Sequence, residues 1–63
     1  MIFLGIDWAE SGHDACLVDE QGGELARARV GDTLEGVGRL QSLVAVHARS
    51  PDDVLVTIET PRL

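Results

Sequence analysis

The sequence predicts one small α/β domain whose elements follow the order strand, strand, strand, helix, strand. Two short, continuous apolar runs, residues 2–6 and 54–58, are typical of strands buried on both faces of a sheet. Between them the apolar residues change from strand-like to helical spacing, and glycine-containing turn signals divide the first half of the chain. We therefore expect strands at about 2–7, 13–19, 24–30 and 54–59, and a helix at about 33–49.

The first three strands should form an antiparallel meander, because only short turns connect them. The segments "ESG" (10–12) and "EQGG" (20–23) are typical of such turns. His13 directly follows the first turn and is expected at the solvated edge of the hairpin. In the third strand, Arg27 and Arg29 alternate with small apolar residues, so both arginines should lie on one solvated face. Two arginines are too few to predict a phosphate-binding track.

The helix should connect the meander to the last strand. Asp32 and Glu35 form a pair that resembles a capping box, and apolar residues recur at spacings of three and four from Leu34 to His47. A single helix between two strands acts as a crossover, so the fourth strand should run parallel to the first and pair beside it. The apolar stripe of the helix then covers one face of the sheet, and no predicted element covers the other.

The first and fourth strands each end in a carboxylate, Asp7 and Glu59. If these strands are parallel neighbours, their ends lie about 4.8 Å apart, the usual spacing within a sheet. Two carboxylates at that separation repel each other unless a cation neutralises them. Because oxygen-only anionic sites suit Mg²⁺ or Mn²⁺, we expect Asp7 and Glu59 to hold such an ion. The plainer interpretation is that each acid is simply solvated at the end of its strand.

On charge alone the chain is a poor binder of DNA, RNA or anionic membrane. The net charge is −6, with five arginines and no lysine, whereas nucleic-acid binding usually depends on a basic surface. The start of the chain has no basic segment before its apolar run, and no run is long enough to cross a membrane, so the cytoplasm is the expected compartment. Cys16 is the single cysteine and is expected to be a buried, inert thiol.

The segments "GIDWAESGHDACLVDEQGGEL" and "IETPR" together resemble the N-terminal part of the DEDD-type transposases of bacterial insertion sequences. Gly5, Ile6 and Asp7 match the family's GID motif on the first strand. Glu59 matches the second acid of the family, which lies in an I-E-[TS] segment at the end of the fourth strand. The resemblance covers essentially the whole chain and implies the RuvC-like, ribonuclease H-like fold, of which these elements would form the first half.

The same resemblance implies a function that the chain could perform only in part. In this family, four acids hold divalent metal ions for cutting and joining DNA strands, a later domain bears a nucleophilic serine, and a structured RNA can guide the choice of target. Asp7 and Glu59 would be the first two of the four acids. Leu63 therefore resembles a truncation point. We expect the fragment to bind Mg²⁺ only weakly and to be inactive by itself.

Two other functions are compatible with these residues. An actin-like sugar kinase or ATPase begins with a similar strand ending in GID, but its next turn is rich in Gly and Thr and holds phosphate. The corresponding segment here, "WAESGHD", has one glycine, no threonine and an extra acid. The chain could also be a non-catalytic remnant or interaction module, in which an unpaired fourth strand or the bare sheet face forms a homo-oligomer.

Overall fold

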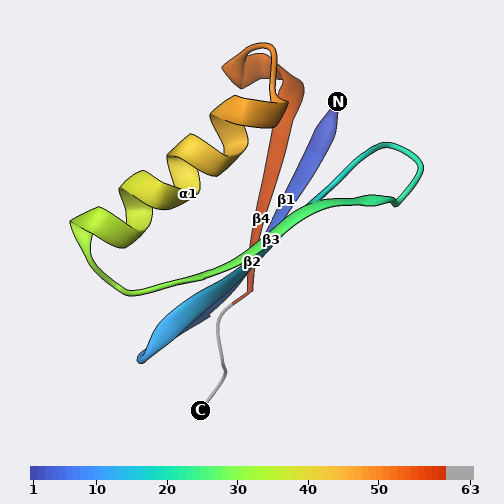
Figure 1. Ribbon diagram of the computed structural model, residues 1–63. Coiled ribbons are helices and arrows are strands. Elements are labelled where there is room, and N and C mark those ends of the chain that lie inside the picture. Colours follow the sequence, from blue (N-terminus) through green and yellow to red (C-terminus); the bar gives the residue numbers. More distant parts are fainter. Residues whose placement is uncertain (60–63) are drawn as a thin grey trace.

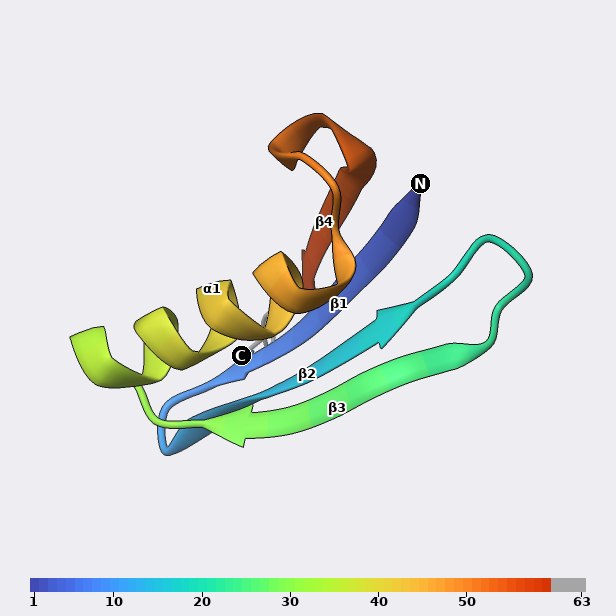
Figure 2. The same ribbon diagram turned by 45° about the horizontal axis from the view of Figure 1, so that its top comes forward.

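The computed structural model describes residues 1–59 and consists of a four-stranded sheet with one α-helix on one of its faces (Figures 1 and 2). This arrangement confirms the predicted α/β class and the predicted order of elements. The elements are β1 (Ile2–Ala9), β2 (Gly12–Val18), β3 (Glu24–Val30), α1 (Leu34–His47), the short 3₁₀ helix η1 (Pro51–Asp53) and β4 (Val54–Glu59).

The strands lie in the order β3-β2-β1-β4. The pairs β1–β2 and β2–β3 are antiparallel, and β4 pairs with β1 in parallel, as the crossover predicted. A connection of only two residues joins β1 to β2, which fixes the register of that hairpin. The turn between β2 and β3 is closed by the Asp19 carboxylate, which accepts hydrogen bonds from the backbone N–H groups of Gln21 (2.9 Å) and Gly23 (2.8 Å).

The hydrophobic core lies between the sheet and α1. Along β1, Ile2, Leu4 and Ile6 face the helix and are buried, whereas the residues between them face the opposite side. From the neighbouring β2, the Leu17 side chain is fully buried. The rest of the core comes from Ala15 and Leu40. Within the described chain no element covers the opposite face, which we call the open face (Figure 2).

The helix begins one residue later than its capping pattern predicted. Thr33 is the N-cap, and its Oγ1 accepts a hydrogen bond from the backbone N–H of Gly36 at 3.0 Å. The side chain of Asp32, the predicted cap, instead lies 3.3 Å from His13 Nε2. Gly36 packs so closely on the connection between β3 and α1 that a Cβ there would clash with the Gly31 carbonyl oxygen. Leu34, two positions earlier, consequently points away from the sheet.

The predicted apolar stripe of α1 is therefore wrong at both of its ends. Leu34 is 93% exposed, and His47 is also exposed, with its Nδ1 3.1 Å from the Leu43 carbonyl oxygen. The stripe that contacts the sheet is shorter and centres on Gly36 and Leu40. No helix in the described part of the chain is long and apolar enough to cross a membrane.

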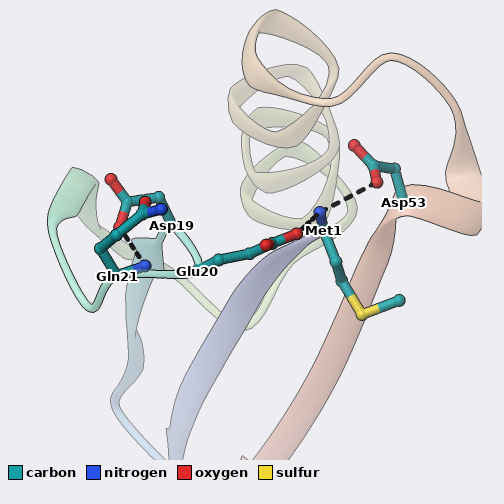
Figure 3. A network of polar contacts seen from close by, with 5 residues as sticks. All are labelled: Met1, Asp19, Glu20, Gln21 and Asp53. Carbon is teal, nitrogen blue, oxygen red and sulfur yellow. Dashed lines mark hydrogen bonds and ion pairs between the residues drawn. The ribbon is translucent and has the colours of Figure 1, made fainter.

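The start of β4 and the rest of the strand differ in their contacts. Its start is fastened to the rest of the sheet, because the Met1 amino group contacts both Glu20 and Asp53, the latter at 3.2 Å (Figure 3). Further along the strand, every residue from 55 to 59 is exposed. Between β4 and α1 the structure has a groove of about 690 Å³ with an apolar lining that includes Leu40, Val44 and Val56.

Candidate functional site

The parallel pairing of β1 and β4 places Asp7 directly beside Glu59, as the sequence predicted. Asp7 follows the buried Ile6, so its side chain lies on the open face, and Glu59 shares that face because it is the register partner of Asp7. Both carboxylates are exposed to solvent. The fold thus brings the two predicted site residues together on one side of the sheet.

A third carboxylate, Asp14, lies in the same row, and the sequence interpretation did not place it there. The register of the β1–β2 hairpin sets Asp14 opposite Asp7, and that of the β2–β3 pair sets Arg29 opposite Asp14. Arg29 Nη1 donates to Asp14 Oδ2 at 2.9 Å. Like charges directly opposite each other destabilise a sheet, so the Arg29 guanidinium offsets part of the repulsion between Asp14 and Asp7. The two-residue turn was the signal that could have predicted this row.

Next to the row of acids the open face is hollowed, because Gly5 has no side chain. Cys16 and Thr57 flank Gly5 on the two neighbouring strands, and the hollow of about 410 Å³ is also lined by Asp7, Asp14, Arg27 and Glu59. A Cβ added to Gly5 would meet the Thr57 hydroxyl at 3.8 Å, an ordinary contact, so the space is open. Oxygen, sulfur and guanidinium groups therefore surround one small depression.

The thiol of Cys16 is half-buried on this open face, so the prediction of a buried cysteine was wrong. Its Sγ lies 3.5 Å from Glu24 Oε1 and 3.8 Å from Arg27 Nη2. The side chain is not covered because α1 packs on the other face. Arg27 itself is exposed, as predicted, and forms an ion pair with Glu24 at 2.8 Å. The hydrogen bond from Arg27, followed by that from Cys16, lowers the pKa of the Glu24 carboxyl.

On the opposite face, His13 supports the end of β1 and is buried, which contradicts the solvated position predicted for it. Its ring stacks on Trp8, with 3.5 Å between the ring centroids, and its Nδ1 accepts the Ala9 backbone N–H at 3.2 Å. A neutral ring with Nδ1 as acceptor has its proton on Nε2. That nitrogen is buried without a well-formed hydrogen bond, and Asp32 Oδ1 lies 3.3 Å from it.

The donor set at Asp7 and Glu59 fits a small divalent cation. Both groups are carboxylates, both are accessible, and Mg²⁺ keeps several of its waters when it binds to one or two carboxylates. Within residues 1–59, no three His, Cys, Asp or Glu side chains are placed to ligate one metal ion. An ion here would therefore have two protein ligands from the described chain and complete its shell with water.

Comparison with known proteins gives two findings. Residues 4–62 match the family model of the IS110 DEDD transposases, described as a transposase. The chain is also 45% identical over 60 residues to a Streptomyces coelicolor protein whose name describes it as a mini-circle transposase for IS117. That match covers 94% of this chain but 14% of the relative, so the chain spans about one seventh of the relative's length. No solved structure matches the chain.

Proposed function

The chain belongs to the IS110 family of DEDD transposases, and we propose that it supplies Asp7 and Glu59 as the first two acids of a divalent-metal site for DNA strand transfer. The observation that supports this role is the pairing of β1 with β4, which sets the two carboxylates side by side on an open, solvent-accessible face. Membership of this family also weighs against the kinase interpretation, which the lack of a Gly- and Thr-rich phosphate turn already disfavours.

The two acids would hold Mg²⁺ or Mn²⁺, the ions that hard oxygen ligands favour. When bound, such an ion neutralises charge on a phosphodiester and lowers the pKa of a bound water or hydroxyl. The contribution of this chain is to fix both ligands on neighbouring strands with a common face. In this proposal Asp14 has only a supporting role, because its carboxylate already accepts a hydrogen bond from Arg29.

DNA is the proposed substrate of the full-length protein and a guide RNA a proposed partner. The fold would be the first half of a RuvC-like, ribonuclease H-like domain, and the cytoplasm the compartment, which suits the free Cys16 thiol. We expect no strand cleavage by the 63-residue chain alone, because the family site uses four acids and this proposal assigns two. Metal binding by two carboxylates should be correspondingly weak.

The metal site can be tested with Mn²⁺ and the chain itself. Paramagnetic Mn²⁺ should selectively broaden the amide NMR signals around Asp7 and Glu59, and Mg²⁺ in excess should restore them. The Asp7→Asn and Glu59→Gln variants should each lose the selective broadening. Asp52→Asn, which removes one exposed carboxylate in η1, is the matched control and should leave the broadening unchanged. Uniform broadening, or broadening that survives Asp7→Asn, would contradict the proposal.

A further inference from the structure

The open face has positive as well as negative side chains, and their places in the register are informative. Arg29 shares a row with Asp14, Asp7 and Glu59, whereas Arg27 shares the next row with Cys16, Gly5 and Thr57. Among the described residues, Arg27 and Arg29 are the only arginines in the sheet, and both lie on the open face with the acids. The other described arginines belong to α1 and the segment that follows it.

The two arginines differ in what holds them. The guanidinium of Arg29 pairs with Asp14 and lies against Gly12, where an added Cβ would be 3.4 Å from Nε and Nη2 of Arg29. Arg27 instead lies along its row toward the hollow, with Nη2 3.8 Å from Cys16 Sγ. Its ion pair is with Glu24, a neighbour on its own strand, and both side chains are more than half exposed. Exposed pairs contribute about 0–1 kcal/mol, and the pair of Arg29 with Asp14 is also more than half exposed on both sides. Arg27 can therefore exchange its partner at little cost, and what sets it apart from Arg29 is that it lines the hollow.

We propose that Arg27 binds a phosphodiester of the DNA strand in the hollow over Gly5, beside the ion held by Asp7 and Glu59. This inference rests on the proposed function and assigns the phosphate contact that the acids alone cannot make. Carboxylates repel a phosphate, and the chain has a net charge of −6, so a bound strand needs a cation on the side of the hollow away from the metal. Arg27 is the guanidinium that lines that side.

Chemistry and space both favour this ligand. A guanidinium can donate two parallel hydrogen bonds to one phosphate, which gives orientation as well as charge. The missing side chain of Gly5 leaves room for the phosphate between Cys16 and Thr57, and the Thr57 hydroxyl, which lies over Gly5, can donate to a phosphate oxygen. A phosphate contact of this kind is independent of base sequence.

The test measures how binding of single-stranded DNA depends on salt. The probe is a fluorescently labelled oligothymidylate of about ten nucleotides, within the usual site sizes for single strands, in buffer that contains Mg²⁺. Each phosphate contact that is lost lowers the slope of log K against log salt concentration by about 0.7. We expect Arg27→Gln to lower the slope by this amount and to weaken binding roughly tenfold at low salt.

Three further variants separate the contact from general effects of charge or folding. Arg39→Gln makes the same charge change on the exposed surface of α1 and should leave the slope unchanged. Glu24→Gln removes the competitor for the Arg27 guanidinium and should strengthen binding. Arg27→Lys keeps the charge and should restore the slope without the full affinity. Equal slopes for the wild type and Arg27→Gln, or equal losses for Arg27→Gln and Arg39→Gln, would overturn the inference.

The phosphate contact and the metal site can fail separately. If Mn²⁺ still broadens the signals of Asp7 and Glu59 in Arg27→Gln while the salt slope is unchanged, the metal proposal stands and the phosphate contact is wrong. If Mn²⁺ does not localise at these acids in the wild type, the metal proposal is wrong. In that case the slope difference between Arg27→Gln and Arg39→Gln still decides whether Arg27 contacts phosphate.

Discussion

The two strands that bear the candidate acids are supported very differently. β1 is paired on both sides and has three core residues facing α1, whereas β4, among the described residues, is paired on one side and is exposed over most of its length. Leu4 and Val56 illustrate the contrast, since they are register partners on the same face, yet Leu4 is 4% exposed and Val56 49%. Asp7 therefore projects from a fixed strand, and Glu59 from one whose position depends mainly on its hydrogen bonds to β1.

This difference has a consequence for metal binding. A two-ligand site is only as well organised as its less constrained ligand, and ordering that ligand costs conformational entropy. On this chain the cost falls on Glu59, which is the last residue of β4 and the last described residue of the chain. Contacts that cover β4 would lower this entropic cost of ordering Glu59. The weak affinity expected for Mg²⁺ thus has a structural source besides the small number of ligands.

The largest expected effect is on the free energy of unfolding, when the side chain of the β1 core residue Leu4 is removed. Leu4→Ala should lower the free energy of unfolding by about 2–5 kcal/mol, because it removes a buried side chain and leaves a cavity. A domain of this size has a total of roughly 3–9 kcal/mol, so the variant should be largely destabilised. Val56→Ala, its register partner on β4, should cost about 1 kcal/mol or less. Urea unfolding followed by circular dichroism measures both, and similar losses for the two variants would contradict the contrast drawn between the strands.

A smaller effect is expected on self-association through β4. Within residues 1–59 the outer edge of β4 is unpaired, and Leu55 and Ile58 are exposed on its opposite faces. We therefore expect the chain to form a homo-oligomer at high micromolar concentration. Edge-to-edge pairing should be weakened about tenfold by either Leu55→Lys or Ile58→Lys, which corresponds to about 1.4 kcal/mol.

Stacking of two open faces would give a different pattern. Leu55 belongs to the open face, so Leu55→Lys should weaken stacking, whereas Ile58 lies on the face toward α1 and Ile58→Lys should have no effect. Light scattering over a concentration series separates the two geometries. A monomer mass at every concentration would show that β4 does not self-associate.

The topology could be predicted from the sequence because each of its determinants is local. Turn residues separate the strands, and one crossover helix requires β4 to be parallel to β1. The burial on both faces that the apolar run 54–58 predicted is wrong, because β4 lies at the edge of the sheet and is exposed from residue 55 to residue 59. The neighbouring positions of Asp7 and Glu59 follow directly, since both acids end their apolar runs. The role of these acids as metal ligands stays a prediction, which the Mn²⁺ experiment decides.

Features that depend on side-chain packing were not predictable in the same way. His13 is polar and next to a turn, so the sequence predicts exposure, but stacking on Trp8 and the bond to the Ala9 N–H bury it. Asp32 and Thr33 are both good N-caps, and the close approach of Gly36 to Gly31 selects Thr33. In each case a side-chain or backbone contact across a turn, four or five residues along the chain, decides between two locally reasonable arrangements.

The smallest expected effect is on thermal stability and comes from the contacts of the Met1 amino group at the start of β4. Hydrogen bonds to Glu20 and then Asp53 raise the pKa of the Met1 amino group above its ordinary value of 8.0. Because the folded pKa is the higher one, the stabilisation is fully present below pH 8.0 and is lost as the pH rises through the folded value. Acetylation of this amino group should remove the pH dependence and lower the thermal midpoint at pH 7 toward the value at high pH.

The pH window is favourable for this measurement, because the sequence has neither lysine nor tyrosine to titrate above pH 8. Cysteine thiols also ionise there, so the comparison is best made in a Cys16→Ser background. The expected result is a small fall in the midpoint between pH 7 and pH 10 for the free amino group and a flat profile for the acetylated chain. Parallel profiles would mean that the contacts of Met1 with Glu20 and Asp53 do not hold β4 to β1. The pairing of β4 with β1 alone would then fix the strand that bears Glu59.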